Sequence, residues 1–235
     1  MIHGLIGHMR GCEVGLPVLA PDLPGYGSMR DSRAEITLPG QVAYLHAFLK
    51  KQGVKSAHLI GHSVGGAIAM LFAAAHPQMV ASVTSVEGNF TLKDAFWSKA
   101  ISHMPLAEIE RDLQADCENP QVWLERSGVA PTPLRLADAL SHLTNQPAST
   151  VQATARSVVQ ITGARQYLQT VRSVLEAGTP VFLIAGQRSR DAWDVPGFVV
   201  AKARKLSVLE RTGHLITIES PAEFNATCAS NLRAL

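Results

Sequence analysis

The sequence predicts an α/β fold, a mostly parallel β-sheet with helices on both faces and a helical segment inserted into it. Three observations support this prediction. Short apolar runs alternate with helical patterns, a serine lies in a glycine-rich turn between one apolar run and an alanine-rich helix, and the middle of the chain is helical throughout. The 235 residues, 46% of them hydrophobic, are enough for one sizeable core.

The turn at Ser63 is the most informative stretch of the chain. The apolar run 58–60 enters Gly61-His62-Ser63-Val64-Gly65, and a helical run to about Ala75 leaves it. Glycines two residues either side of a serine remove side chains that would collide at such a corner, and Gly66 lets the helix lie close to the sheet. The serine hydroxyl is then held at the carboxyl edge of the sheet, above a helix N-terminus. By itself the pattern also fits a glycine-rich turn without chemistry.

Further elements precede and follow this turn. Residues 1–7 are interpreted as the end of a strand that enters a glycine-bearing loop. Residues 17–22 are predicted to form a short strand, closed by the turn-rich residues 23–28. A helical period then ends at Gly53, and a further strand covers 80–86.

From residue 90 to residue 178 the pattern is helical, is broken at prolines and contains no convincing strand. Strands resume at 180–186 and 205–210, and the last helix is predicted to open with a capping box, Ser220-Pro221-Ala222-Glu223. We therefore expect a core formed by residues 1–89 and 179–235. Residues 90–178 are expected to form a helical lid over the carboxyl edge of the sheet, where α/β sheets bind ligands.

Composition and charge exclude several classes of function. The formal net charge is +2 and there is no basic block, so neither nucleic acid nor a membrane surface is indicated as a partner. The three cysteines, Cys12, Cys117 and Cys228, lack metal-ligand spacing and are interpreted as reduced thiols. No leader and no run of membrane-spanning length is recognisable, so a soluble, cytoplasmic protein without metal or cofactor is expected.

Five pieces of the chain, in this order, resemble the α/β-hydrolase superfamily over nearly the whole length. They are His3-Gly4, residues 22–27, residues 61–66, residues 180–186, and Gly213-His214 followed by Glu219 and Pro221. The superfamily normally has two or three strands before its His-Gly motif. Because His3 comes almost at once, we expect an N-terminally shortened α/β-hydrolase fold, in which either the first hairpin is absent or the chain starts from an internal methionine. A missing edge strand exposes sheet hydrogen-bonding groups unless a partner or loop covers them.

The resemblance implies a role for each of these motifs. Ser63 would be the nucleophile, and His214 would be the base that takes its proton and later the acid for the leaving group. The backbone N–H groups of Leu5 and Val64 would form the oxyanion hole. His62 is expected only to shape the turn.

The acidic partner of the histidine is less clear. Relatives usually carry it in a G-x-x-D loop, but here Ser189 stands where the aspartate belongs. A shifted loop could use Asp191 or Asp194. Some superfamily members place the acid after the strand that follows the nucleophile helix, and Glu87 occupies that place. We favour Glu87. The alternative is that Glu87 has no catalytic role and is a strand-terminal glutamate exposed to solvent or paired with a lid residue.

The function expected from these residues is hydrolysis of an apolar acyl or aryl ester through an acyl-enzyme. A serine at this turn argues against dehalogenase and epoxide hydrolase activity, which use aspartate there. A carbon–carbon bond hydrolase and a ligand receptor with little turnover are the alternatives, and the oligomeric state is open. Lid side chains could line the pocket, with Tyr26 in its wall. The candidates are Phe96, Trp97, Met104, Trp123 and Leu140.

Overall fold

Four parallel strands form the sheet of this protein in a computed structural model that describes residues 1–235. The strands are adjacent in sequence order, with Gly61 opposite Ser85 and Val86 opposite Ile184. Every residue of the third strand is buried, as expected for an apolar run at the centre of a parallel sheet. Each of the four matches an apolar run predicted to be a strand. Their bounds are β1 Ala57–His62, β2 Val80–Val86, β3 Val181–Gly186 and β4 Lys205–Leu209.

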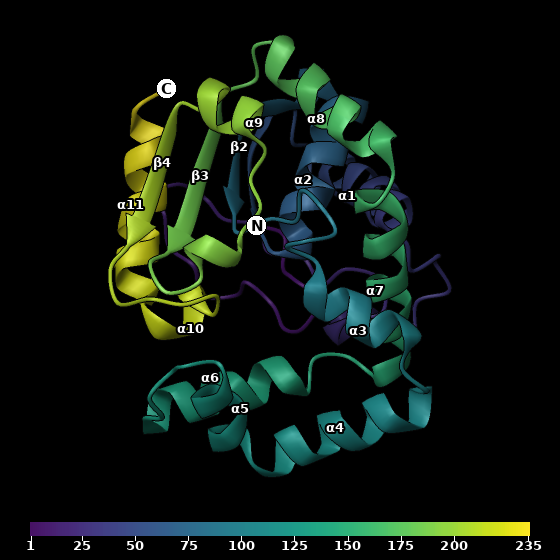
Figure 1. Ribbon diagram of the computed structural model, residues 1–235. Helices are drawn as coiled ribbons and strands as arrows, with labels where there is room; N and C mark the ends of the chain where they lie inside the picture. The colour runs from purple at the N-terminus through teal and green to yellow at the C-terminus, as the bar shows by residue number, and fades with distance from the viewer.

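Helices cover both faces of the sheet (Figure 1). On one face α2 (Val64–Ala75) packs against β1 and β2, and α1 (Leu38–Lys51) and α8 (Arg165–Glu176) pack against α2. On the other face α11 (Pro221–Arg233) packs against β4. The predicted α/β fold is thus confirmed. The remaining short helices of the sheet region are η1 Gly27–Met29, η2 Pro77–Met79, η3 Arg190–Ala192, α9 Gly197–Lys202 and α10 Ile216–Glu219.

Between β2 and β3 the chain is helical and contains no strand, as predicted. Figure 1 shows α4, α5 and α6 beyond the carboxyl ends of the strands, away from the helices that cover the sheet. By contrast α8, which falls within the predicted lid residues 90–178, packs against α2 of the sheet layer. The inserted helices are α3 Phe96–His103, α4 Leu106–Glu118, α5 Pro120–Arg126, α6 Pro133–Leu143 and α7 Ala148–Thr162.

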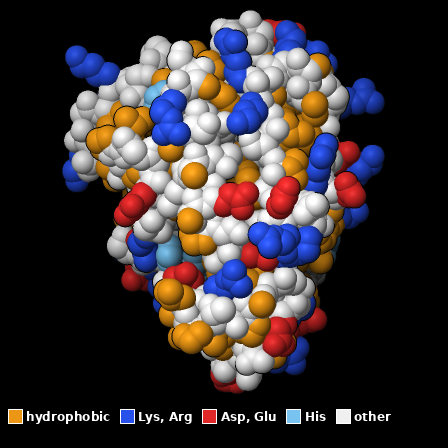
Figure 2. Space-filling model, turned by 90° about the vertical axis from the view of Figure 1, so that its left-hand side faces the viewer, with side chains coloured by type: hydrophobic (Ala, Val, Ile, Leu, Met, Phe, Trp, Pro, Cys, Tyr) orange, Lys and Arg blue, Asp and Glu red, His pale blue; other side chains and the backbone are white.

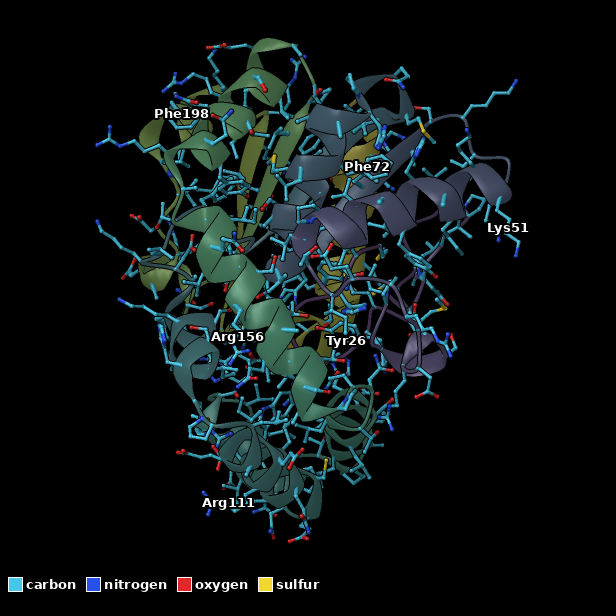
Figure 3. All side chains as sticks on the ribbon, turned by 90° about the vertical axis from the view of Figure 1, so that its right-hand side faces the viewer. Tyr26, Lys51, Phe72, Arg111, Arg156 and Phe198 are labelled. Atoms are coloured by element: carbon cyan, nitrogen blue, oxygen red, sulfur yellow. The ribbon has the colours of Figure 1, made fainter.

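The side chains of the strands alternate between two buried clusters, one on each face of the sheet. Leu59 and Val83 belong to the larger cluster with Phe72 of α2, which Figure 3 labels among the helices of that face. Ile60 and Phe224 belong to the smaller cluster under α11. Because both faces are filled in this way, the ends of the strands are held rigidly.

The short strand predicted at residues 17–22 is wrong. These residues have no ladder partner, and Pro17 and Pro21 lack the N–H that a ladder requires. Only Ile2 bridges the outer side of β1: its N–H donates to Ile60 O at 2.8 Å, and its carbonyl accepts from the His62 N–H at 3.0 Å. In this structure β1 is therefore the edge strand of the sheet.

The capping box predicted for the last helix is also wrong. α11 begins at Pro221 as expected, but the Ser220 side chain makes no capping hydrogen bond. Its Oγ instead lies 3.1 Å from Thr212 Oγ1, and this contact ties the start of the helix to the loop that precedes His214. The backbone of Ser220 leaves the region that a capping serine normally adopts, with φ −139° and ψ 58°.

The surface carries charges of both signs. Figure 2 shows basic and acidic side chains interspersed on the face of the molecule that bears α11, without a continuous field of one sign. All three cysteines are free. None of the helices combines the length and the apolar character that crossing a bilayer requires.

Candidate active site

Ser63 lies at the corner between β1 and α2 in a strained backbone conformation. Its φ of 54° and ψ of −122° are rare for a residue with a side chain, so the surroundings must enforce them. The Ser63 N–H donates to Val86 O at 2.9 Å, which fixes the corner to β2. A Cβ added at Gly65 would lie 2.2 Å from Ile2 O, and one added at Gly66 would lie 2.5 Å from Gly88 Cα. The glycines therefore serve the close approach that the sequence predicted.

Glu87 and His214 are in direct contact, with His214 Nδ1 2.6 Å from Glu87 Oε2. The glutamate follows β2 with φ 44° and is buried. Its other carboxylate oxygen accepts hydrogen bonds from the Gly186 N–H at 2.7 Å and from Ser189 Oγ at 2.5 Å. Burial alone would raise the pKa of Glu87, but the hydrogen bonds from His214, Ser189 and Gly186 outweigh it and hold that pKa below its usual value.

The loop that carries His214 is fixed from two sides. The Gly213 N–H donates to Glu219 Oε2 at 2.7 Å, and the same oxygen pairs with the Arg188 guanidinium at 2.9 Å. On the other side, His62 Nε2 lies 2.9 Å from the carbonyl oxygen of His214. Burial, followed by the nearby His214, lowers the pKa of His62 to about 4, so its ring is neutral near pH 7 and can donate this hydrogen bond.

Ser63 and His214 line the same cavity, but no hydrogen bond joins Ser63 Oγ to His214. The histidine ring is held instead by its contact with Glu87. Nucleophile and base often approach to hydrogen-bonding distance only when substrate binds. The arrangement therefore places a serine and a carboxylate-bound imidazole on one cavity without a contact between them.

The loop after His3-Gly4 lies against the serine. A Cβ added at Gly4 would lie 3.1 Å from Ser63 Cβ, a tight contact, so the glycine allows this loop its close approach to the serine. The Leu5 N–H has no hydrogen-bond acceptor in the protein. Val64 is the first residue of α2, where an N–H has no acceptor within the helix. Both groups predicted to bind an oxyanion are thus available next to Ser63.

The two aspartates considered as alternatives to Glu87 lie elsewhere. Asp194 Oδ2 accepts a hydrogen bond from Thr91 Oγ1 at 2.6 Å, and Asp191 lies in η3 without a contact to His214. The sequence did not predict that Ser189 would hold the carboxylate of Glu87. Its position at the place of the missing aspartate was a signal, because a residue there reaches Glu87, which contacts His214.

The cavity has a volume of about 570 Å³ and lies between the sheet and the inserted helices. Its lining is mostly apolar, with aromatic side chains from α3, α5 and the loop after β3. Phe96, Trp97, Met104 and Trp123 line it as predicted, together with Trp193, but Leu140 does not. Tyr26 is also absent from the lining, because its ring is buried between His3 and α7.

A half-buried carboxyl group, that of Asp94, also lines this cavity. Burial raises the pKa of Asp94 to about 6, although its oxygens accept hydrogen bonds from the backbone of Phe90 and from Asn89. No three His, Cys, Asp or Glu side chains lie together in a way that could hold a metal ion. The polar side chains that line the cavity include Ser63 and His214 together with Glu87, Asn89, Asp94 and Ser189.

Comparison with known proteins agrees with this architecture. The alpha/beta hydrolase family matches residues 1–227, so the chain belongs to this family. The dihydrolipoyllysine-residue acetyltransferase component of an acetoin cleaving system from Cupriavidus necator is 26% identical over 215 residues, which are 92% of this chain and 56% of that protein. A monoacylglycerol lipase of Homo sapiens is 30% identical over 127 residues, 45% of this chain and 38% of that enzyme.

Among solved structures, a thermophilic esterase from Thermogutta terrifontis superposes with a TM-score of 0.70 at 16% identity. The match covers 99% of this chain and 88% of that one, and at this identity it shows the fold alone. Of the two curated relatives, in contrast, the chain spans only about half or less of the length.

Proposed function

We propose that this protein hydrolyses carboxyl esters through an acyl-enzyme on Ser63, with His214 as general base and acid and Glu87 as its acidic partner. The observation that carries the proposal is the 2.6 Å contact between His214 Nδ1 and a buried, hydrogen-bonded Glu87, on the same cavity as the strained Ser63. A carboxylate at this distance fixes the imidazole with its proton on Nδ1. It therefore leaves Nε2 free to accept a proton.

The reaction follows from these positions. Ser63 Oγ attacks the ester carbonyl while its proton passes to His214 Nε2, and Glu87 stabilises the resulting imidazolium. The N–H groups of Leu5 and Val64 bind the oxyanion of the tetrahedral intermediate. Collapse expels the alcohol, which takes its proton from His214. Water then attacks the acyl-enzyme and gives a proton to His214. When the second tetrahedral intermediate collapses, this proton passes to Ser63 Oγ and the carboxylic acid leaves.

The lining of the cavity supports an apolar substrate. Phe96, Trp97, Trp123 and Trp193 bring aromatic surface to a space of about 570 Å³, which suits one acyl or aryl group rather than a polymer. Helices α3, α4 and α5 contribute much of this lining, so we infer that they act as the lid. The similarity to a lipase is consistent with an acyl substrate.

The test is covalent labelling with a fluorophosphonate probe, located by peptide mass mapping. We expect one adduct on Ser63, and none in Ser63→Ala or His214→Ala with unchanged circular dichroism. Ser149→Ala, at an exposed serine of α7, is the matched control and should label like wild type. Labelling that survives Ser63→Ala would remove Ser63 from the role of nucleophile.

Turnover of p-nitrophenyl esters of increasing acyl length then separates the candidate activities. A competent ester hydrolase releases p-nitrophenol in a Ser63-dependent manner. Labelling of Ser63 without release of any alcohol would instead favour a ligand receptor. Cleavage of a dienoate substrate without ester turnover would favour a carbon–carbon bond hydrolase.

A further inference from the structure

We propose that His3 is a positioning residue that aims the Leu5 N–H at the oxyanion. This inference rests on the proposed function, because it assigns the group that prepares one half of the oxyanion hole. It starts from a local observation: His3 Nδ1 lies 3.0 Å from the carbonyl oxygen of Gly4, the next residue.

The Gly4 carbonyl and the Leu5 N–H belong to one peptide unit. The unit is planar and trans, so its C=O and N–H point in opposite directions. A hydrogen bond that holds the Gly4 oxygen on the side of His3 therefore turns the Leu5 N–H to the other side. That N–H has no acceptor in the protein, and Leu5 lines the cavity together with Ser63. His3 thus sets the direction of a donor that it does not touch.

The ring of His3 is itself fixed. Its Nε2 accepts a hydrogen bond from the Leu23 N–H at 3.4 Å, which leaves the ring proton on Nδ1, the atom that faces the Gly4 oxygen. The ring packs edge-on against Tyr26 with 4.4 Å between centroids, and both residues are buried. Burial lowers the pKa of His3 to about 4, so the imidazole remains neutral and keeps one tautomer near pH 7.

The peptide unit on the other side of Leu5 is held by Tyr26, whose hydroxyl is also in contact with α7. The Tyr26 hydroxyl donates to Leu5 O at 3.0 Å and lies 3.2 Å from Thr154 Oγ1 of α7. Figure 3 shows Tyr26 beside this helix. The Gly7 N–H donates to Gln146 Oε1 at 2.9 Å, which anchors the end of the loop. The free Leu5 N–H is therefore flanked by fixed carbonyls, and only the Gly4 carbonyl depends on His3.

Two variants test the hydrogen bond from His3 Nδ1 to Gly4 O separately from the rest of the His3 ring. In His3→Asn the side-chain amide nitrogen can occupy the place of Nδ1 and still donate to Gly4 O. In His3→Gln the amide lies at the place of Nε2, and the bond to Gly4 O is lost. We expect kcat of His3→Gln to fall on the order of 10- to 100-fold, less than the loss caused by deleting an oxyanion donor outright. His3→Asn should stay within about threefold of wild type, because the donor to Gly4 O is kept.

If His3 only stabilised the fold, replacing it would not weaken transition-state binding more than substrate binding. We therefore expect KM of His3→Gln to change little, while its affinity for a trifluoromethyl ketone, which forms a tetrahedral oxyanion on the serine, falls in parallel with kcat. Equal activity of the two variants, whether both high or both low, would overturn the proposal. So would a loss that appears only in KM.

Nuclear magnetic resonance keeps the inference independent of turnover, and the ring signals of the wild-type protein also make it independent of variant folding. At pH 7 the ¹⁵N shifts of the His3 ring should show a protonated Nδ1 and an unprotonated Nε2. The Leu5 amide signal should shift in His3→Gln but not in His3→Asn. A proton on Nε2 in the wild type, or an unmoved Leu5 signal, overturns the inference even if the protein is an active esterase. If no ester is turned over and Ser63 is not labelled, the proposed function fails while these signals still test the orientation of the peptide.

Discussion

The two halves of the site are held by different means. The half that contains Glu87 and His214 is fixed by side-chain hydrogen bonds, since Glu87 receives donors from His214, Ser189 and Gly186. The half that contains Ser63 has no side-chain partner and is fixed by backbone packing against Gly4 and Gly65. Polar changes should therefore damage the first half through charge and protonation. Changes of volume should damage the second half through displacement.

The largest effect on activity is expected from removing the negative charge of Glu87. Glu87→Gln keeps the shape of the side chain but no longer stabilises an imidazolium, so we expect kcat to fall by about 10³- to 10⁴-fold. Steady-state ester hydrolysis measures this loss. Asp194→Asn is the matched control, because its carboxylate binds Thr91 rather than His214, and it should change kcat by less than about threefold. Similar losses in both variants would refute the assignment of Glu87.

In the half of the site that contains Ser63, an added methyl group should lower the stability of the fold. In Gly65→Ala the new Cβ would lie 2.2 Å from Ile2 O, so the N-terminal residues or α2 must move. We expect the free energy of unfolding to fall by about 2 kcal/mol or more, as for other overpacked sites. Urea denaturation measures this. Gly197→Ala, where an added Cβ meets no atom within 4 Å, should be near neutral. Equal stability of the two variants would contradict the packing argument.

The smallest effect should come from the hydroxyl that supports Glu87. Ser189→Ala removes a hydrogen bond to the charged carboxylate, which raises the pKa of Glu87. Activity requires the ionised form, so its loss on acidification should begin at a higher pH. We also expect kcat at pH 7 to fall about tenfold or less, the cost of about one hydrogen bond to a charged group.

The pH profile of kcat/KM tests this prediction, with Ser189→Thr as the variant that keeps the hydroxyl. An acid limb that stays in place in Ser189→Ala, or that shifts equally in Ser189→Thr, would show that the hydroxyl does not act on the carboxylate.

Much of the fold could be predicted because its signals are local. The apolar runs located β1 to β4 to within a few residues, and the helical pattern of residues 90–178 predicted the inserted helices, since these features depend on neighbouring side chains. The strand predicted at residues 17–22 is wrong because a strand also needs a partner strand. Nothing in an apolar run between Pro17 and Pro21 reveals whether a partner strand lies beside it.

The site was only partly predictable. The turn at Ser63 is recognisable from its glycines. The contact between Glu87 and His214 joins residues 127 positions apart, so the sequence favoured Glu87 but left Asp191 and Asp194 open as alternatives. The roles of Ser189 and of His3 depend on distances and on the direction of a peptide plane, neither of which a residue pattern encodes.

The cavity draws its two walls from separate parts of the chain. The proposed reacting groups and oxyanion donors lie in the turns and loops of the sheet region, while Phe96, Trp97 and Trp123 reach in from the inserted helices. Selectivity and chemistry are therefore encoded in separate stretches of sequence. Under the proposed function, the inserted helices can be randomised in a library to alter which molecules fit, while Ser63, His214 and Glu87 stay unchanged.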